Sequence, residues 1–425
     1  MAASLAQNAV SLIDTLFLGF LGRVELAAGG IGVVLFLTIG FIGLGLGTGV
    51  QVLAAQSVGK GEKSSLGPLL RESLRVAGIV GFALTIAVWW GAEPLLSSLM
   101  QDDRTCYTTT IFLQGRSLEL FPLILFGVLR GYYSGTAQTQ YILHANILLA
   151  FTNFLLNGFF VWVLKLGLYG VIAGSVIAQY GATAYLFWAL RKQKYKLSIS
   201  SASLEKWTGA LLRYAGPAVL QNIIGMAGWL VFFLLIERRG AIALAAANVI
   251  RSIYSFCMLP TWALATAVGT LVGYFWGARQ PASLLAAFRR TWIISQSIGT
   301  GTAFFLALLS REIVGLFTRD AVVAQEAQEG LYLIAISLVL MPASALLLSA
   351  VVAVGKVVTA FIVEVVVILA YIGYAFWMHT RGVKLLWMWT AEWVYWIPSA
   401  IILGLIFMHR LSSLAHKCYT IRDVS

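Results

Sequence analysis

The stretch Ser4–Gly30, SLAQNAVSLIDTLFLGFLGRVELAAGG, decides the fold of this chain. It begins as an apolar run that is long enough to cross a bilayer as a helix, which takes roughly 20 residues. One carboxylate, Asp14, falls near the middle of that run. Because Gln7, Ser11 and Asp14 recur at three- and four-residue spacing, a helix would place them on one face. An ionised carboxylate at that depth costs roughly 2.5–3.5 kcal/mol, so we expect Asp14 to face a cavity and to have a function.

The composition of the whole chain is that of an α-helical membrane protein. Of the 425 residues, 60% are hydrophobic and only 11% are charged, and the mean hydropathy is +0.87. A soluble protein of this length needs a larger share of charged residues for its surface. The apolar residues occur in long runs rather than in short alternating segments. This pattern predicts an all-α polytopic membrane protein with about twelve transmembrane helices and excludes an outer-membrane barrel.

The net charge of +12 fits the positive-inside rule and does not require a nucleic-acid partner. With both termini placed in the cytoplasm, the predicted cytoplasmic connections carry roughly twice as many Lys and Arg residues as the opposite ones. We therefore predict a protein integral to the membrane, in the cytoplasmic (inner) membrane of a bacterium, with both termini cytoplasmic.

The chain divides into two similar halves. Residues 191–207, RKQKYKLSISSASLEKW, form one long polar and basic break, which predicts a cytoplasmic linker. On this basis an N-lobe of six helices occupies 1–190, a C-lobe of six helices occupies 208–410, and a cytoplasmic tail occupies 411–425. Short motifs recur in order between the halves: Gln7-Asn8 with Gln221-Asn222, Leu26-Ala27-Ala28 with Leu244-Ala245-Ala246, Gly59 with Gly277, Pro122 with Pro342, and Gly135 with Gly355. Since each half holds an even number of helices, we predict a parallel internal repeat with a cavity between the lobes.

The two halves differ in how they begin. The second half carries the lead-in LLRYAGP (Leu211–Pro217) before its Gln-Asn pair, whereas only six residues precede Gln7. This difference leaves open a late start or a truncated N-terminus, and with it a short first helix. No short apolar segment with a cleavage site is evident, so the first helix is expected to be retained as an anchor.

Several motifs resemble those of the multidrug and toxic compound extrusion (MATE) family. They are IDTLFLGFLGRVELAAGGI (13–31), AQSVGKG (55–61), LRGYYSGTAQT (129–139), NFLLN (153–157) and LYGVIAGSVIAQ (168–179) in the first half, and GPAVLQN (216–222), RGAIALAAANVIRSIYSFCMLP (239–260) and WGARQ (276–280) in the second. The resemblance covers nearly the whole chain. It implies twelve helices in two lobes, a cavity that opens alternately to the two sides of the membrane, and export of organic cations or other amphipathic compounds driven by H⁺ or Na⁺ entry.

The resemblance also assigns roles to individual residues. Asp14 matches the acidic residue of the first helix that couples cation entry, and Asn153 and Asn157 match the polar pair of the fifth helix that lines the same cavity. Some members carry an acid where this chain has Asn157, and the C-lobe acids of the Na⁺-coupled branch fall near Gly225 and Met341. The resemblance therefore favours H⁺ as the coupling ion and keeps Na⁺ at Asp14 as the alternative, with no firm metal site.

Other polar residues within the predicted helices are candidates for lining a cavity or binding substrate: Gln7, Ser11, Arg116, Glu119, Gln179, Arg251 and Glu364. Arg116 and Glu119 lie one turn apart, so they either neutralise each other, or Arg116 adjusts Asp14 while Glu119 meets a cationic substrate. Arg251 and Glu364 belong to the same lobe, so they either form one ion pair or bind substrate or a proton.

Two further groups of residues receive structural interpretations. Glu93, Lys165 and Glu392 lie near predicted helix ends, where charged side chains can reach the membrane surface. The glycines of the second predicted helix (Gly40, Gly43, Gly45, Gly47 and Gly49) predict close packing against a neighbouring helix.

Together these observations predict a secondary-active antiporter of the multidrug type, a xenobiotic transporter that works by alternating access and is driven by H⁺. Its partners are small amphipathic or cationic substrates and membrane lipids, without a cofactor, and we expect a monomer. Four scattered histidines and three isolated cysteines form no catalytic or metal-binding pattern, which predicts a transporter rather than an enzyme. Two alternatives stay open: a Na⁺-coupled antiporter, and a lipid-linked oligosaccharide flippase of the same superfamily, which would favour more embedded basic residues than Arg116 and Arg251.

Overall fold

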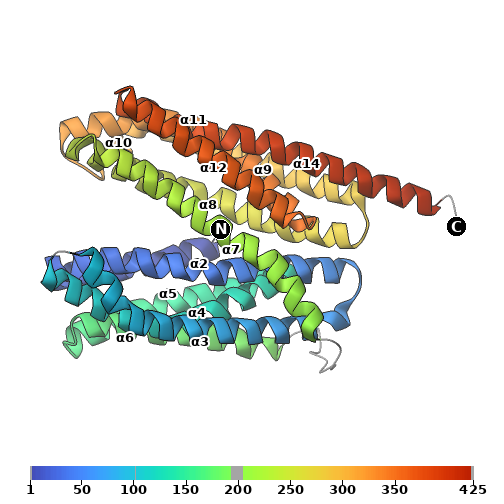
Figure 1. Ribbon diagram of the computed structural model, residues 1–425, viewed down its shortest axis with the longest axis horizontal. Coiled ribbons are helices and arrows are strands. Elements are labelled where there is room, and N and C mark those ends of the chain that lie inside the picture. The colour runs from blue at the N-terminus through green and yellow to red at the C-terminus, as the bar shows by residue number, and fades with distance from the viewer. Residues whose placement is uncertain (1, 101, 193–203, 423–425) are drawn as a thin grey trace. The chain divides into compact units, whose positions relative to one another are not determined.

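The computed structural model describes residues 2–100, 102–192 and 204–422, with side chains over 10–98, 100, 102–192 and 207–416. All regular structure in these ranges is helical (Figure 1). Twelve α-helices have 20 or more residues: α1 Ala2–Leu21, α2 Arg23–Gly59, α3 Leu66–Leu99, α4 Asp103–Gly135, α5 Thr139–Gly158, α6 Leu168–Leu190, α7 Leu204–Glu237, α8 Ala241–Gly277, α9 Pro281–Leu308, α11 Ala321–Ala353, α12 Val357–Thr380 and α14 Ala391–Arg422. The short elements are η1 Lys63–Ser65, η2 Phe159–Val163, α10 Ser310–Gly315 and α13 Leu385–Met388. The predicted all-α class and the number of long helices are confirmed.

Ten of these helices are long and apolar enough to cross a membrane, judged by length and composition over the described residues. The two long helices outside this set are α1, whose described apolar part is Val10–Leu21, and α9. An interior that is built from so many apolar helices of this length identifies an integral membrane protein.

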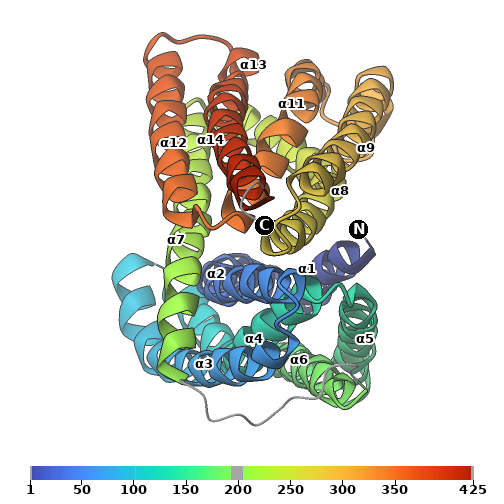
Figure 2. The same cartoon turned by 90° about the vertical axis from the view of Figure 1, so that its right-hand side faces the viewer.

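The chain forms two compact units, one that ends at Val219 and one that begins at Leu220, so that α7 contributes to both. In unit 1, α2 and α3 both pack on α4, and α6 packs on both α4 and α5. In unit 2 the same relations recur, because α8 and α9 both pack on α11, and α14 packs on both α11 and α12 (Figure 2). This repeated set of neighbours agrees with the predicted parallel repeat.

Glycines let α2 and α4 approach each other closely in unit 1. A Cβ atom at Gly131 would lie 2.0 Å from the carbonyl oxygen of Gly47, and a Cβ atom at Gly127 would lie 2.4 Å from that of Gly43. The backbones of α2 and α4 therefore come so close that no side chain fits between them at these positions, as in other closely packed membrane helices. The predicted role of the glycines on the second helix is confirmed.

An arginine ties two turns of unit 2 together. Arg239, in the turn between α7 and α8, donates hydrogen bonds to the carbonyl oxygens of Met378 (3.1 Å), His379 (3.3 Å) and Val383. The last carbonyls of a helix have no partner within the helix, so this side chain satisfies the end of α12. The contact fixes the α7–α8 turn against the turn that follows α12.

The structure describes only part of the predicted linker and part of the predicted tail. Residues 193–203 of the predicted linker lie outside the described residues, and α7 already begins at Leu204. Within the predicted tail, α14 continues as a helix through Arg422. The lobe boundaries at 190 and 208 stay a prediction.

Candidate functional site

Asp14 lies inside unit 1, on the inner face of α1. Its side chain is only 1% exposed, whereas Leu12 and Leu16 on the same helix are 66% and 63% exposed. Phe17 and Leu18 are buried with Asp14, so α1 presents an apolar outer face and an inner face that contains one carboxylate. Helical periodicity alone produces this division, because residues three and four apart share a face.

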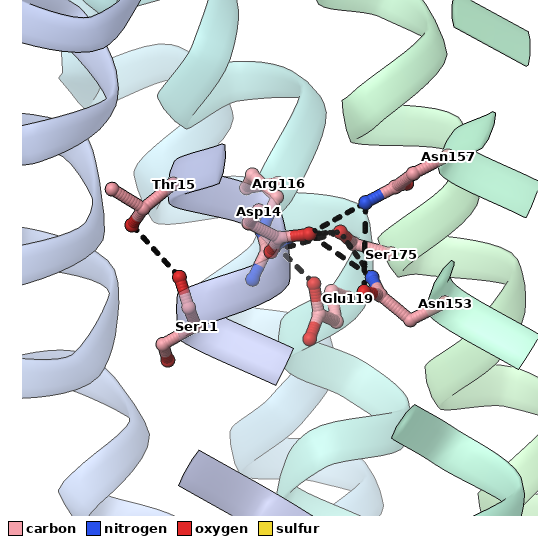
Figure 3. A network of polar contacts seen from close by, with 8 residues as sticks. All are labelled: Ser11, Asp14, Thr15, Arg116, Glu119, Asn153, Asn157 and Ser175. Carbon is pink, nitrogen blue, oxygen red and sulfur yellow. Dashed lines mark hydrogen bonds and ion pairs between the residues drawn. The ribbon is translucent and has the colours of Figure 1, made fainter. Parts of the chain in front are cut away.

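Four side chains from three other helices donate hydrogen bonds to the Asp14 carboxylate (Figure 3). Oδ1 accepts from the Nδ2 groups of Asn153 (3.0 Å) and Asn157 (2.9 Å), both on α5. The Ser175 hydroxyl on α6 lies 2.9 Å from Oδ1 and 3.0 Å from Oδ2. Arg116 on α4 donates from Nη1 to Oδ2 at 2.7 Å. The carboxylate thus links α1, α4, α5 and α6.

Arg116 lies between two carboxylates. Its Nη1 pairs with Asp14, and its Nε lies 3.0 Å from Oε2 of Glu119. The Nε–H bond does not point at that oxygen, so the contact is an ion pair without a well-directed hydrogen bond, and both atoms keep hydrogen-bonding capacity. The guanidinium also lies over the rings of Phe36 and Phe112, with 4.7 Å and 5.8 Å from Cζ to the ring centroids. Such stacking on aromatic faces holds a guanidinium in place.

The site contains one positive and two potentially negative groups, all of them buried. Arg116 is 5% exposed and Glu119 is 4% exposed. Buried charges are costly unless they are paired and hydrogen-bonded, and here a single guanidinium serves two carboxyl groups. With both carboxyl groups ionised the cluster carries one net negative charge, and with one of them protonated it is neutral.

The helices around Asp14 place hydrogen-bond donors next to its carboxylate. Asn153 and Asn157 are one helical turn apart, so both carboxamides leave α5 in the same direction. Directly after them α5 passes into the π-helical turn η2, Phe159–Val163. Such turns are common where a helix carries a functional site. On α6, Gly174 directly precedes Ser175 and leaves room for the Asn157 carboxamide.

Six of the residues singled out in the sequence can be placed relative to this site. Asn153, Asn157, Arg116 and Glu119 surround Asp14, so the interpretation in which Arg116 acts on Asp14 agrees with the geometry. Gln179 is buried one turn beyond Ser175 and donates to Thr183 at 3.5 Å rather than to Asp14. Ser11 accepts from the Thr15 hydroxyl through its backbone oxygen, and its side chain points away from the carboxylate (Figure 3).

Two further polar residues are Gln7, a predicted site residue, and Ser175, which was not predicted. The Gln7 side chain lies outside the described residues. Ser175 was missed as a site residue, although it lies within the motif LYGVIAGSVIAQ, one turn before Gln179. Its signal was its place in an apolar helix, where a hydroxyl needs a hydrogen-bond partner. The partner, on α1, is far away in the sequence.

Of the two interpretations of Arg251 and Glu364 in unit 2, the ion pair is wrong. Arg251 is exposed on α8, and its guanidinium lies over the ring of Phe233, 5.3 Å from the centroid. Glu364 is buried on α12 and accepts a hydrogen bond from the Tyr395 hydroxyl on α14. Neither residue forms an ion pair within the described part of the chain. The two charged groups do not meet because Arg251 is exposed and lies over Phe233, whereas Glu364 is buried and bonded to Tyr395 on α14.

The surface interpretation of Glu392 is also wrong. Its side chain is 2% exposed in the first turn of α14 and accepts hydrogen bonds from the Tyr254 hydroxyl (3.0 Å) and the Trp396 indole (3.1 Å). Glu93 and Lys165, in contrast, are exposed. A carboxylate with enough buried donors can stay inside the protein, whatever its distance from the helix end.

No group of three or more His, Cys, Asp or Glu side chains that could hold a metal ion occurs among the residues that the structure describes. Asn153, Asn157 and Ser175 also carry side-chain oxygens, but the two amides direct their NH₂ groups toward the carboxylate and the Ser175 hydroxyl donates to it. As arranged, these side chains act as donors to Asp14 and not as cation ligands.

The helices and the buried charged site define a polytopic α-helical membrane protein with two repeated units. A family model described as MatE matches residues 1–159 and 217–377, which is well over half of the chain. The chain therefore belongs to the MatE family, and the resemblance seen in its motifs is confirmed.

Individual relatives of the chain are named as multidrug resistance proteins. The chain is 27% identical over 334 residues to a protein named "Probable multidrug resistance protein NorM" from Synechocystis sp., covering 74% of this chain and 70% of that protein. It is 24% identical over 340 residues to "Multidrug resistance protein PmpM" from Pseudomonas aeruginosa, covering 76% of this chain and 70% of that protein.

Solved structures share the fold at low sequence identity. One, described as MATE in complex with MaL6, has a TM-score of 0.92 at 19% identity and covers 98% of this chain and 95% of that one. Another, described as the outward-facing conformation of a multidrug resistance MATE family transporter of the MOP superfamily, has a TM-score of 0.91 at 20% identity and covers 98% and 94%. These likenesses confirm the all-helical two-lobed architecture.

Proposed function

We propose that the chain is a secondary-active exporter that exchanges organic cations or other amphipathic compounds for H⁺ by alternating access. Asp14 is the proton-binding carboxylate, and Arg116, Asn153, Asn157 and Ser175 hold it in its charged form. The observation that carries this proposal is the burial of Asp14 among donors from three other helices. The multidrug names of the relatives support the substrate class.

Protonation of Asp14 would change the contacts of four helices at once. The carboxyl group would lose the charge that pairs with Arg116 at 2.7 Å, and one of its oxygens would become a donor. The donors from α5 and α6 would then face a weaker acceptor, so their present arrangement would lose stability relative to another packing of the unit. A ligand shifts a conformational equilibrium only through such a difference in contacts between two states.

Arg116 can pair with Glu119 as well as with Asp14. When Asp14 is protonated, Arg116 and Glu119 neutralise each other across 3.0 Å, and the site can exist without net charge. When the proton leaves Asp14, the cluster regains one negative charge, which attracts a cationic substrate. Substrate and proton thus favour opposite charge states, which is the requirement for exchange.

The orientation of the amides supports H⁺ rather than Na⁺ as the coupling ion. A hard cation is bound by several oxygens at short distance. Here Asn153 and Asn157 direct nitrogens toward Asp14, and both would have to turn to offer oxygens. Na⁺ coupling therefore requires a different arrangement of the same side chains and remains the alternative.

The remaining parts of the proposal follow from the class of protein. The transporter would act as a monomer in a bacterial inner membrane, with both termini cytoplasmic, and would need an ion gradient instead of a cofactor or an enzymatic step. The flippase alternative has less support, because Arg116 is engaged by two carboxylates and Arg251 is exposed and lies over Phe233. These are the two basic residues within the predicted helices, and a flippase would favour more of them.

The test is transport by the purified chain in lipid vesicles, with ethidium and a small panel of other organic cations as probes. An imposed pH gradient should drive probe movement against its concentration gradient, and removal of Na⁺ should leave the rate unchanged. Movement that requires a Na⁺ gradient would replace H⁺ by Na⁺ in the proposal. Failure of every cation to move under either gradient would overturn the multidrug assignment.

A further inference from the structure

Unit 2 contains a second buried group of acidic side chains, which the Asp14 site does not use. Glu364 on α12 is 4% exposed and Glu392 on α14 is 2% exposed. Both lie in helices that are long and apolar enough to cross the membrane. Each ionised carboxylate at such depth would be costly without compensation.

The two carboxylates are compensated to different extents. Oε2 of Glu392 accepts from the Tyr254 hydroxyl at 3.0 Å and from the Trp396 indole at 3.1 Å. Glu364 accepts one hydrogen bond, from Tyr395 to Oε1, and its Oε2 is buried without a hydrogen-bond partner. Because donors stabilise the ionised form of a carboxylate, Glu392 is arranged to carry a charge and Glu364 is not.

Among the residues that the structure describes, no positive side chain balances these two carboxylates. Within the described residues, neither Glu364 nor Glu392 forms an ion pair with a Lys or Arg side chain. The basic residue of α8, Arg251, is exposed and stacks on Phe233. Unit 1 differs in this respect, since Arg116 lies between its two carboxylates. An ionised Glu364 in the present arrangement would therefore be a buried charge with one hydrogen bond and no positive partner.

Aromatic groups from the neighbouring helices surround the pair. The Tyr254 hydroxyl from α8 donates to Glu392, and the Tyr395 hydroxyl from α14 donates to Glu364. The Tyr371 hydroxyl lies near Glu392 but outside hydrogen-bond geometry, and is buried without a partner. From α7, the Phe232 ring lies 5.6 Å from that of Tyr371 and 5.1 Å from that of Trp389, centroid to centroid.

The surroundings define what the site can bind. The nearby pocket of unit 2, of about 470 Å³, is lined by Tyr374, Trp387, Thr390, Trp393, Val394, Ile397 and Pro398, and not by either carboxylate. An organic cation in this pocket would therefore not contact Glu364. A metal cation would need several oxygen ligands, whereas the walls consist mainly of aromatic carbon. A proton needs only the unpartnered oxygen.

We propose that Glu364 is an exchangeable proton-binding site of unit 2, separate from the Asp14 site, and that Glu392 is its ionised neighbour, held by Tyr254 and Trp396. The proton binds to Oε2 of Glu364, while Tyr395 positions Oε1. The Tyr371 hydroxyl, which lies near Glu392 and has no hydrogen-bond partner, is a further polar group of this part of unit 2. The inference does not depend on whether Asp14 couples transport.

The test is an infrared pH titration of the purified chain in lipid vesicles, between about pH 5 and about pH 9, a range in which buried carboxyl groups can titrate. The C=O stretching band of a protonated carboxyl group should disappear as the pH rises. This band should persist in Asp14→Asn and in Glu312→Gln, which removes an exposed acid of unit 2. It should be lost in Glu364→Gln.

A second variant keeps the test valid if Glu364→Gln fails to fold. Tyr395→Phe removes the hydrogen bond to Oε1 and should shift the frequency of the same band without abolishing it. A band that survives Glu364→Gln unchanged would overturn the assignment. So would a Glu364 band that is present at every pH, since the carboxyl group would then be a permanent structural acid, or a band that Na⁺ removes at constant pH, since the site would then bind metal.

Discussion

Gly174 faces the side-chain oxygen of Asn157 so closely that no larger residue fits between them. A Cβ atom at position 174 would lie 2.1 Å from Asn157 Oδ1 and 3.1 Å from its backbone nitrogen. That oxygen is buried and has no hydrogen-bond partner, while the Nδ2 of the same amide donates to Asp14. Because Gly174 on α6 has no side chain, the Asn157 amide on α5 can keep the orientation in which it donates to Asp14.

The first prediction concerns this contact. Gly174→Ala should displace the Asn157 amide from Asp14 and lower proton-driven transport by roughly tenfold or more, as displacements of about 1 Å do in other sites. Gly181→Ala on the same helix is the matched control, because a Cβ atom there meets nothing within 4 Å. Transport rates in vesicles decide the matter. Equal rates for the two variants would show that the position of the Asn157 amide does not matter.

The second prediction concerns the shared guanidinium. Arg116→Gln leaves Asp14 and Glu119 buried together without a positive partner, and removal of one partner from a buried ion pair costs about 3–5 kcal/mol. Thermal unfolding in detergent should show this loss, whereas Arg104→Gln, an exposed residue of the same helix, should change stability little. Adding Glu119→Gln to Arg116→Gln should restore part of the stability, because one buried charge is then removed. A double variant that is no more stable than Arg116→Gln alone would argue against charge as the cause.

The third prediction concerns the turn contact of unit 2. Arg239→Gln loses the hydrogen bonds to Met378, His379 and Val383 and should lower stability by about 1–3 kcal/mol. The neighbouring Arg238 is exposed, so Arg238→Gln serves as the control in the same unfolding measurement. Similar losses in both variants would point to the charge of the turn and not to the carbonyl contacts.

The fourth prediction concerns Arg251 and Glu364. Because the two side chains make no contact, a double-mutant cycle of Arg251→Gln and Glu364→Gln should give a coupling free energy within about 0.5 kcal/mol of zero. The cycle of Tyr395→Phe with Glu364→Gln should give a larger value, since these two side chains share a hydrogen bond. A large coupling in the first cycle would support the ion pair that was one of the two interpretations drawn from the sequence.

Sequence patterns predicted the fold well, for physical reasons. Long apolar runs can only become helices in a membrane, and the glycines of α2 predicted close packing because few other features explain so many in one helix. The cluster around Asp14 was also anticipated in part, because the resemblance to the MATE family implied that Asn153 and Asn157 line the same cavity as Asp14, and an action of Arg116 on Asp14 was one of two interpretations of Arg116. Local spacing added that Asn153 and Asn157 share a helix face.

The rest depends on contacts between distant parts of the chain. Ser175 reaches Asp14 only because α1 and α6 meet in space, which no spacing within either helix shows. Arg251 and Glu364 have opposite charges in one lobe, yet rotation of α8 and α12 directs them to different surroundings. Glu392 is close to a helix end but finds Tyr254 and Trp396 inside the unit. Side-chain direction and the availability of donors, which the sequence does not specify, decided these cases.

The most direct test of the central claim is proton movement coupled to substrate in vesicles that contain Asp14→Asn. The variant keeps the size of the side chain and removes its charge, and Asp103→Asn, an exposed residue of α4, is the control. We predict that Asp14→Asn binds the organic cation that wild type transports more weakly, because the cluster no longer carries a net negative charge, and shows neither pH-driven efflux nor substrate-induced proton flux. Wild-type proton flux and efflux in Asp14→Asn would contradict the account.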